Sequence, residues 1–116
     1  MKAMSHFSVP MLKQLARIVR FEQHEYSGHV LFRQGDPGTS WFIIIRGEVD
    51  VAVADKVLLL KVSYFIGIFQ GIVCSLVEGD DFGKMALVSD SARSATVTLR
   101  DDDSQFIRVD KQDFKR

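Results

Sequence analysis

Apolar residues recur with two different spacings along the chain, which predict a helix near the N-terminus and a longer region of strands after it. Between Ser8 and Arg20, apolar side chains recur every three or four residues, which is the spacing of one helix face. These apolar positions are Met11, Leu12, Leu15, Ile18 and Val19. Ser8 suits the N-cap and Pro10 the first turn. The pattern predicts one amphipathic helix that packs against a neighbouring layer.

From Gly28 onward the apolar runs become short, and turn-forming residues separate them. Apolar or alternating runs occupy residues 29–32, 41–45, 48–53, 95–99 and 105–109. Residues 110–113 resemble the N-terminus of a further helix, with acidic residues at both ends of its first turn. Short strands between Gly-rich turns predict a mainly β protein, a β-roll or jelly roll (double-stranded β-helix) with flanking short helices.

One apolar segment does not follow this pattern. Val57 to Phe69 contains a single charge, Lys61, in thirteen residues. A membrane-spanning helix needs about 20 apolar residues. Length therefore favours an additional strand over a membrane anchor, and we expect no membrane association. A buried strand pair, an interfacial segment and a partner surface all remain open for this segment.

The composition suits one domain with one core, because 47% of the 116 residues are hydrophobic. Fifteen basic residues balance fifteen acidic ones. A nucleic-acid-binding domain usually carries a basic excess or stripe, so the balance argues against a nucleic-acid partner. Residues 1–6 lack the apolar core of a signal peptide, and we expect a cytoplasmic protein.

Residues that could bind a metal or act as nucleophiles are few and dispersed. The three histidines, His6, His24 and His29, show no ligand spacing. Cys74 is the only cysteine, so no internal disulfide can form. It lies in the apolar run 72–76, where we expect a small core residue rather than a nucleophile. The chain therefore predicts no metal site and no catalytic residues, which disfavours a metal-dependent cupin-like enzyme.

Gly79 to Leu87, followed by Arg93, is the segment with the most binding chemistry. Gly83 permits close backbone approach, and the first amides of a short helix have no partner inside that helix. Arg93 would add two parallel donors. These parts suit a single phosphate. Structural turns with the same glycine spacing are common, so the residues alone leave both an anion site and a structural turn open.

Residues 82–87 (Phe-Gly-Lys-Met-Ala-Leu) and 93–97 (Arg-Ser-Ala-Thr-Val) together resemble the phosphate-binding cassette of the cyclic nucleotide-binding domain family. Other similar stretches are 30–35, 38–45, 47–51, 78–83 and 106–114. The last two are most similar to the cAMP-binding domain of Epac-type Rap guanine-nucleotide exchange factors. The resemblance is therefore spread along the chain and is specific.

The resemblance implies a ligand and its contacts. Arg93 would bind the equatorial phosphate oxygens, together with the amides of Ala86 and Ser94. Gly83 and Lys84 would lie along the ribose, with two apolar side chains near the base. The implied ligand-binding positions are Val51, Gly83, Lys84, Met85, Ala86, Arg93, Ser94 and Ala95. The valine and the methionine have ordinary core positions as the alternative.

Three positions depart from the usual family pattern. Lys84 stands where most members carry a glutamate that accepts from the ribose 2′-hydroxyl, and a lysine cannot accept that bond. Epac domains also lack the glutamate. Ala92 replaces a proline, which leaves a less rigid approach to Arg93. Ser94 stands where cAMP binders usually have alanine and cGMP binders threonine. The resemblance thus implies looser ribose recognition, with cAMP as the expected ligand and cGMP as the alternative.

The implied function is that of a cAMP-binding regulatory module of a Rap-type exchange factor, in which the nucleotide releases an effector region. A Rap-family GTPase would be a partner through the parent protein. Residues 1–116 would form one domain that is not itself an enzyme and needs no cofactor. The family's hinge and lid helices would follow Arg116, so their absence implies weaker binding. A non-binding structural β-roll interaction module is the alternative.

Residues 57–70 are additional to the family pattern. In that pattern, residues 53–56 would turn almost directly into the strand at 72–76 as a hairpin. The insert therefore predicts an enlarged hairpin or a protruding apolar loop, and a translated intron is the other explanation.

Overall fold

The computed structural model describes residues 8–54 and 71–114. In chain order, the described elements are α1 (Val9–Ala16), β1 (Val19–His24), β2 (Val30–Phe32), β3 (Ser40–Arg46), β4 (Val49–Val53), β5 (Gly71–Leu76), β6 (Asp81–Phe82), the 3-10 helix η2 (Lys84–Leu87), β7 (Thr96–Leu99), β8 (Ser104–Asp110) and α3 (Lys111–Phe114). The predicted mainly β fold with flanking short helices is confirmed.

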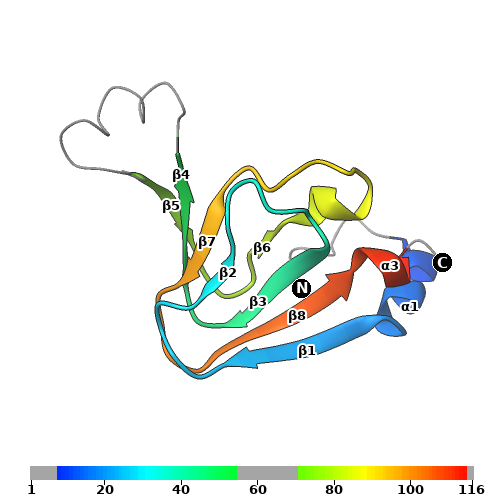
Figure 1. Ribbon diagram of the computed structural model, residues 1–116. Helices are drawn as coiled ribbons and strands as arrows, with labels where there is room; N and C mark the ends of the chain where they lie inside the picture. Colours follow the sequence, from blue (N-terminus) through cyan, green and yellow to red (C-terminus); the bar gives the residue numbers. More distant parts are fainter. Residues whose placement is uncertain (1–7, 55–70, 115–116) are drawn as a thin grey trace.

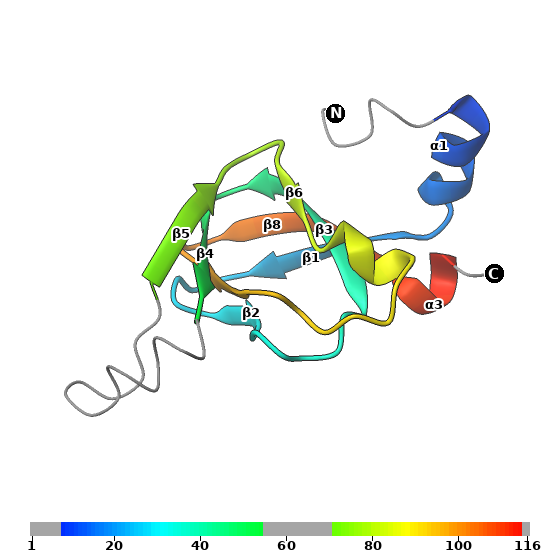
Figure 2. The same cartoon turned by 90° about the horizontal axis from the view of Figure 1, so that it is seen from above.

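The strands form two four-stranded antiparallel sheets. Sheet A has the order β1-β8-β3-β6, and sheet B has the order β2-β7-β4-β5. Figures 1 and 2 show α1 and α3 at one end of the molecule and the β4–β5 pair at the other. Strands that are neighbours in a sheet are often distant in sequence, which is typical of a β-roll.

β3 is buried on both faces, which explains its continuous apolar run. Successive strand residues point to opposite faces. Phe42 and Ile44 therefore point into the core between the sheets, where they pack with Phe106. The rings of Phe42 and Phe106 meet edge to face with centroids 6.1 Å apart. Val49, Val97 and Leu99 complete this buried cluster.

The opposite face of β3 carries a second buried cluster, which both helices cover. Trp41 and Ile43 pack there with Leu15 of α1, and Phe114 of α3 packs against them. The predicted cap of α1 is confirmed, because Ser8 Oγ accepts from the Met11 amide at 3.3 Å.

The prediction that the helical stripe continues to Val19 is wrong. The helix ends at Ala16, and Val19 begins β1, where it pairs with Val109. Six residue pairs join β1 to β8. The hydrogen bonds of this ladder replace the one further helical turn that the periodicity suggested.

β4 and β5 form the hairpin strands that the family pattern predicts. Their pairing runs from Val49 with Leu76 to Val53 with Gly71. Val49 is fully buried, and exposure rises along β4 to Val53. The apolar insert predicted at residues 57–70 lies outside the described residues, so every expectation about it stays a prediction.

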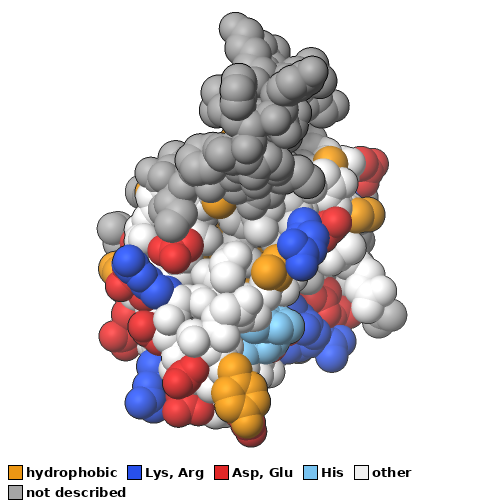
Figure 3. Space-filling model, turned by 60° about the vertical axis from the view of Figure 1, so that its left-hand side comes forward, with side chains coloured by type: hydrophobic (Ala, Val, Ile, Leu, Met, Phe, Trp, Pro, Cys, Tyr) orange, Lys and Arg blue, Asp and Glu red, His pale blue; other side chains and the backbone are white. Residues whose placement is uncertain are grey.

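The surface carries both signs of charge. On the face drawn in Figure 3, acidic and basic side chains are interspersed and hydrophobic side chains are scattered. Across residues 8–54 and 71–114, no helix is long and apolar enough to span a membrane.

Candidate functional site

A pocket of about 430 Å³ lies between the inner face of sheet B and the segment that joins β6 to β7. This volume is in the range of small-molecule sites. The eight positions that the resemblance implied all line it: Val51, Gly83, Lys84, Met85, Ala86, Arg93, Ser94 and Ala95. The structure therefore brings the predicted positions together, and their role in binding stays a prediction.

Arg93 is the most buried charged side chain of the pocket, with 8% of its surface exposed. Its Nη2 donates to the Ser40 carbonyl at 2.5 Å, and its Nη1 donates to the Gly83 carbonyl at 3.3 Å. The guanidinium carbon lies 4.0 Å from the ring centroid of Phe32. Three separate elements therefore hold one guanidinium inside the molecule.

One donor of Arg93 is left over. Its Nε is buried and has no hydrogen-bond partner within residues 8–54 and 71–114. Burial lowers the pKa of Arg93 below its ordinary value, while the negative charge of Asp36 opposes that shift. Arginine stays protonated in proteins, so the pocket keeps a positive charge. A buried cation with an unmatched donor favours an anionic acceptor.

The backbone of Arg93 is anchored to the turn between β2 and β3. Its amide donates to the Asp36 carbonyl, and its own carbonyl accepts from the Gly35 amide, both at 2.8 Å. Pro37 and Ala92 form a β-bridge beside these bonds. The direction of the Arg93 side chain is therefore set by main-chain contacts on both sides of the residue.

Gly83 leaves space for the guanidinium. Its φ of +81° lies in the left-handed region, and it immediately precedes η2. A Cβ at this position would lie 2.4 Å from Arg93 Nη1. The Gly83 carbonyl also accepts from the Ala86 amide at 3.1 Å. Only glycine combines this backbone conformation with so close an approach.

The other predicted positions are distributed around the pocket wall. Met85 is 67% exposed, so the alternative that it is a core residue is wrong. Val51 is half-buried and packs against the core between the sheets while it lines the pocket. Lys84 Nζ lies 5.6 Å from the ring centroid of Trp41. Ser94 is exposed beside Arg93.

Three pocket residues were missed or misjudged from the sequence. Phe32 supports Arg93, and Asp81 accepts from Trp41 Nε1 at 2.7 Å. Cys74 was expected in the core, but it is exposed and lines the pocket. The strand alternation of residues 72–76 could have placed Cys74 and Leu76 on one face. It could not show that this face borders a pocket.

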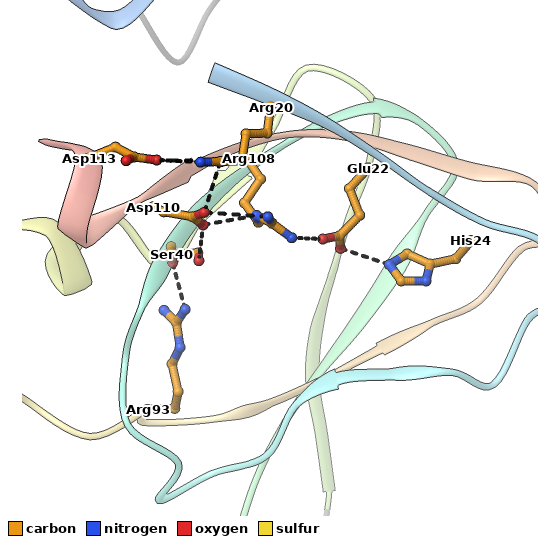
Figure 4. A network of polar contacts seen from close by, with 8 residues as sticks. All are labelled: Arg20, Glu22, His24, Ser40, Arg93, Arg108, Asp110 and Asp113. Atoms are coloured by element: carbon orange, nitrogen blue, oxygen red, sulfur yellow. Dashed lines mark hydrogen bonds and ion pairs between the residues drawn. The ribbon is translucent and has the colours of Figure 1, made fainter. Parts of the chain in front are cut away.

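A polar network continues from Arg93 toward α3 (Figure 4). Ser40 connects the two regions: its carbonyl accepts from Arg93, and its Oγ donates to Asp110 Oδ1 at 2.7 Å. Asp110 is the last residue of β8 and pairs with Arg20 at 3.2 Å and with Arg108 at 2.9 Å. Arg20 also pairs with Asp113 of α3 at 3.0 Å. Ser40 thus connects the Arg93 guanidinium with Asp110, the residue that immediately precedes α3.

The far part of the network lies along β1. Glu22 pairs with Arg108 and contacts His24 at 2.7 Å. Burial opposes the charge of Arg108, but the hydrogen bond from Glu22 and the charge of Asp110 raise its pKa above the ordinary value. Arg108 is therefore a fixed positive charge that orients Asp110.

Residues 22–116 match the family described as the cyclic nucleotide-binding domain. The chain belongs to this family. The match spans every described strand from β2 to β8 and the second half of β1.

The domain is homologous to the cyclic nucleotide-binding domains of Rap exchange factors. It is 47% identical over 115 residues to Rap guanine nucleotide exchange factor 3 of Homo sapiens, which covers 99% of this chain and 11% of that protein. Identity to Rap guanine nucleotide exchange factor 1 of Caenorhabditis elegans is 44% over 115 residues, covering 99% of this chain and 10% of that protein. The chain thus spans about a tenth of the length of these relatives.

Solved structures show the same fold. The regulatory domain of Toxoplasma gondii PKA in a co-crystal with cAMP matches the cyclic nucleotide-binding domain with a TM-score of 0.75 at 21% identity, covering 97% of this chain and 39% of that chain. The catabolite activator protein of Thermus thermophilus matches with a TM-score of 0.76 at 17% identity, covering 99% and 48%.

Gly83→Ala should destabilise the domain because the new methyl group meets Arg93 in a left-handed backbone conformation. We expect the free energy of unfolding to fall by about 1–3 kcal/mol. Gly79→Ala is the matched control, because Gly79 has φ +91° but nothing within 4 Å of an added Cβ. It should cost less than Gly83→Ala in urea unfolding followed by Trp41 fluorescence. Equal losses for the two variants would contradict the close contact.

Proposed function

We propose that this domain binds cAMP and serves as a regulatory module of a Rap-type guanine-nucleotide exchange factor. The observation that best supports the proposal is the environment of the Arg93 side chain. Arg93 is 8% exposed in a pocket of about 430 Å³, and its Nε has no acceptor within the part of the chain that the structure describes. A cyclic phosphate supplies both the negative charge and the acceptor oxygens that this group favours.

The remaining walls suit a nucleoside. Val51, Leu76 and Phe82 give one side of the pocket an apolar character that fits a purine. Lys84 cannot accept a bond from the ribose 2′-hydroxyl, so we expect weak ribose selectivity. Ser94 has a hydroxyl that could reach a guanine amino group. We propose cAMP as the preferred ligand and cGMP as the competitor to be measured beside it.

Two contacts support coupling from the pocket to α3. The first is the Ser40 connection between Arg93 and Asp110. The second is Lys111, whose Nζ donates to the Ser89 carbonyl at 2.7 Å and pairs with Asp90 at 2.5 Å. A nucleotide that orders the segment from Gly83 to Arg93 would therefore bias the start of α3. In the parent protein this bias would release an effector region that acts on a Rap-family GTPase.

A structural role for Arg93 is the competing function. Its two carbonyl contacts and its stacking on Phe32 would hold β2, β3 and η2 together without any ligand. In that case the domain would be a non-binding β-roll that serves as an interaction module.

Arg93→Ala should weaken cAMP binding by about tenfold to a hundredfold, because charge-assisted hydrogen bonds contribute about 1.5–3 kcal/mol. Isothermal titration calorimetry of the whole 116-residue chain with cAMP and with cGMP measures this. Arg46→Ala is the matched control, because Arg46 is exposed at the end of β3 and does not line the pocket. Its affinity should equal that of the wild type.

The two candidate functions predict different results in this titration. Saturable wild-type binding that Arg93→Ala weakens supports the nucleotide receptor. No saturable binding of either nucleotide by a folded wild type would contradict it. If Arg93→Ala then lowered the free energy of unfolding, the structural role would be supported.

Saturating cAMP should slow amide hydrogen exchange in residues 83–95 and also in residues 110–114, because Ser40 and Lys111 connect these segments. Exchange of the amides of residues 21–24 in β1, none of which lines the pocket, serves as the internal reference. Mass spectrometry of peptic fragments measures the effect. Protection confined to residues 83–95 would show that the nucleotide does not act on α3.

A further inference from the structure

Cys74 lies on the wall of the nucleotide pocket. It pairs with Val51 across the β4–β5 ladder, and its side chain shares a face with Leu76, because strand residues two apart point the same way. All three residues line the pocket. Ser75 points to the other face, where its Oγ donates to Asp50 at 2.8 Å.

The thiol is accessible to small molecules. Cys74 is exposed and is the only cysteine in the sequence. It belongs to β5, which is one of the two edge strands of sheet B in the part of the chain that the structure describes. An exposed thiol can meet a disulfide from solvent, and the thiolate form of a cysteine attacks disulfides.

An independent observation marks this pocket as one that receives an anion. Arg93 lines it with 8% of its surface exposed and with an unpartnered Nε among the described residues. Lys84 adds a second cationic side chain to the wall. Asp81 also lines the pocket, and its carboxylate accepts from Trp41 Nε1 at 2.7 Å. The cationic side chains on the wall of the pocket that the thiol lines therefore favour reagents that carry carboxylates.

We propose that Cys74 is a site of reversible S-thiolation, at which glutathione disulfide reacts in the nucleotide-free pocket and thereby excludes the nucleotide. The inference rests on the proposed function, because it concerns regulation of the same pocket. The carboxylates of glutathione match the charge of Arg93, and the attached tripeptide takes the space that the nucleotide needs.

The exchange balances without any further oxidant. The Cys74 thiol loses its proton, and the thiolate attacks one sulfur of glutathione disulfide. A new sulfur–sulfur bond forms to Cys74 while the original one breaks. The departing glutathione thiolate takes up the proton and leaves as glutathione. A dithiol such as dithiothreitol reverses the step.

The test combines affinity and modification measurements on the whole 116-residue chain. The reduced protein is titrated with cAMP, treated with glutathione disulfide, titrated again, and titrated a third time after dithiothreitol; intact mass reports the extent of modification. We expect the modified protein to lose saturable binding and reduction to restore it. In the reverse experiment, cAMP at ten times its Kd should slow modification about tenfold, because only the free pocket reacts.

Two controls isolate the thiol and the charge. Cys74→Ser should show the same cAMP affinity before and after treatment with glutathione disulfide. Cystamine is a cationic disulfide. For each disulfide, the rate of reaction with the protein is divided by its rate of reaction with free cysteine. This normalised rate should be lower for cystamine than for glutathione disulfide.

The outcomes separate the inference from the proposed function. If the modified protein binds cAMP like the reduced one, or if cAMP does not slow the modification, the inference is overturned and the receptor function stands. If cystamine reacts faster by the normalised rate, the anionic preference is overturned. If the reduced wild type binds no nucleotide, the proposed function fails, and the regulatory inference is overturned with it.

Discussion

The buried guanidinium of Arg93 connects the fold to the site. Burying a charge costs several kcal/mol unless its partners are well placed. The partners here are the Ser40 carbonyl of β3, the Gly83 carbonyl before η2 and the Phe32 ring of β2. Each belongs to a different part of the roll. The charge is therefore matched only where these three parts of the roll meet, and its Nε has no hydrogen-bond partner among the described residues.

The same residue is connected by hydrogen bonds to the end of β8, where α3 begins. Ser40 contacts Arg93 with its main chain and Asp110 with its side chain. β3 and β8 pair directly at these two residues. Ser40 is therefore the one residue between the Arg93 guanidinium and Asp110, which immediately precedes α3. The chain is homologous to the cyclic nucleotide-binding domains of Rap exchange factors. In the proposed function, this connection would transmit nucleotide binding to the rest of such a protein.

Much of the fold could be predicted because its signals are local. The run at residues 41–45, the alternation of Val49 with Val51 and the cap at Ser8 each depend on near neighbours in the chain. The cassette could be found for a similar reason, because Gly83 and Arg93 are ten residues apart. The pocket then brought all eight implied positions together.

The missed features depend on contacts between distant residues. β1 has polar side chains at Arg20 and Glu22, which pair with Asp110 and Arg108 from a strand more than eighty residues away. His24 contacts Glu22 on the same strand. Nothing in residues 19–24 alone shows the distant partner strand. The prediction for Cys74 was wrong because it relied on near neighbours in the sequence. Its apolar neighbours suggest a core, but the inner face of an edge strand can border a pocket as well as a core.

The most direct test of the account is the NMR signal of the Arg93 side-chain Nε–H group during a titration with cAMP, assigned by its loss in Arg93→Lys. If a cyclic phosphate binds beside the buried guanidinium, this signal moves and its movement saturates at the Kd found by calorimetry, while the Nε–H signal of Arg46 stays in place. An Arg93 signal that does not move at saturating cAMP would contradict the account, because the ligand would then bind without the buried guanidinium.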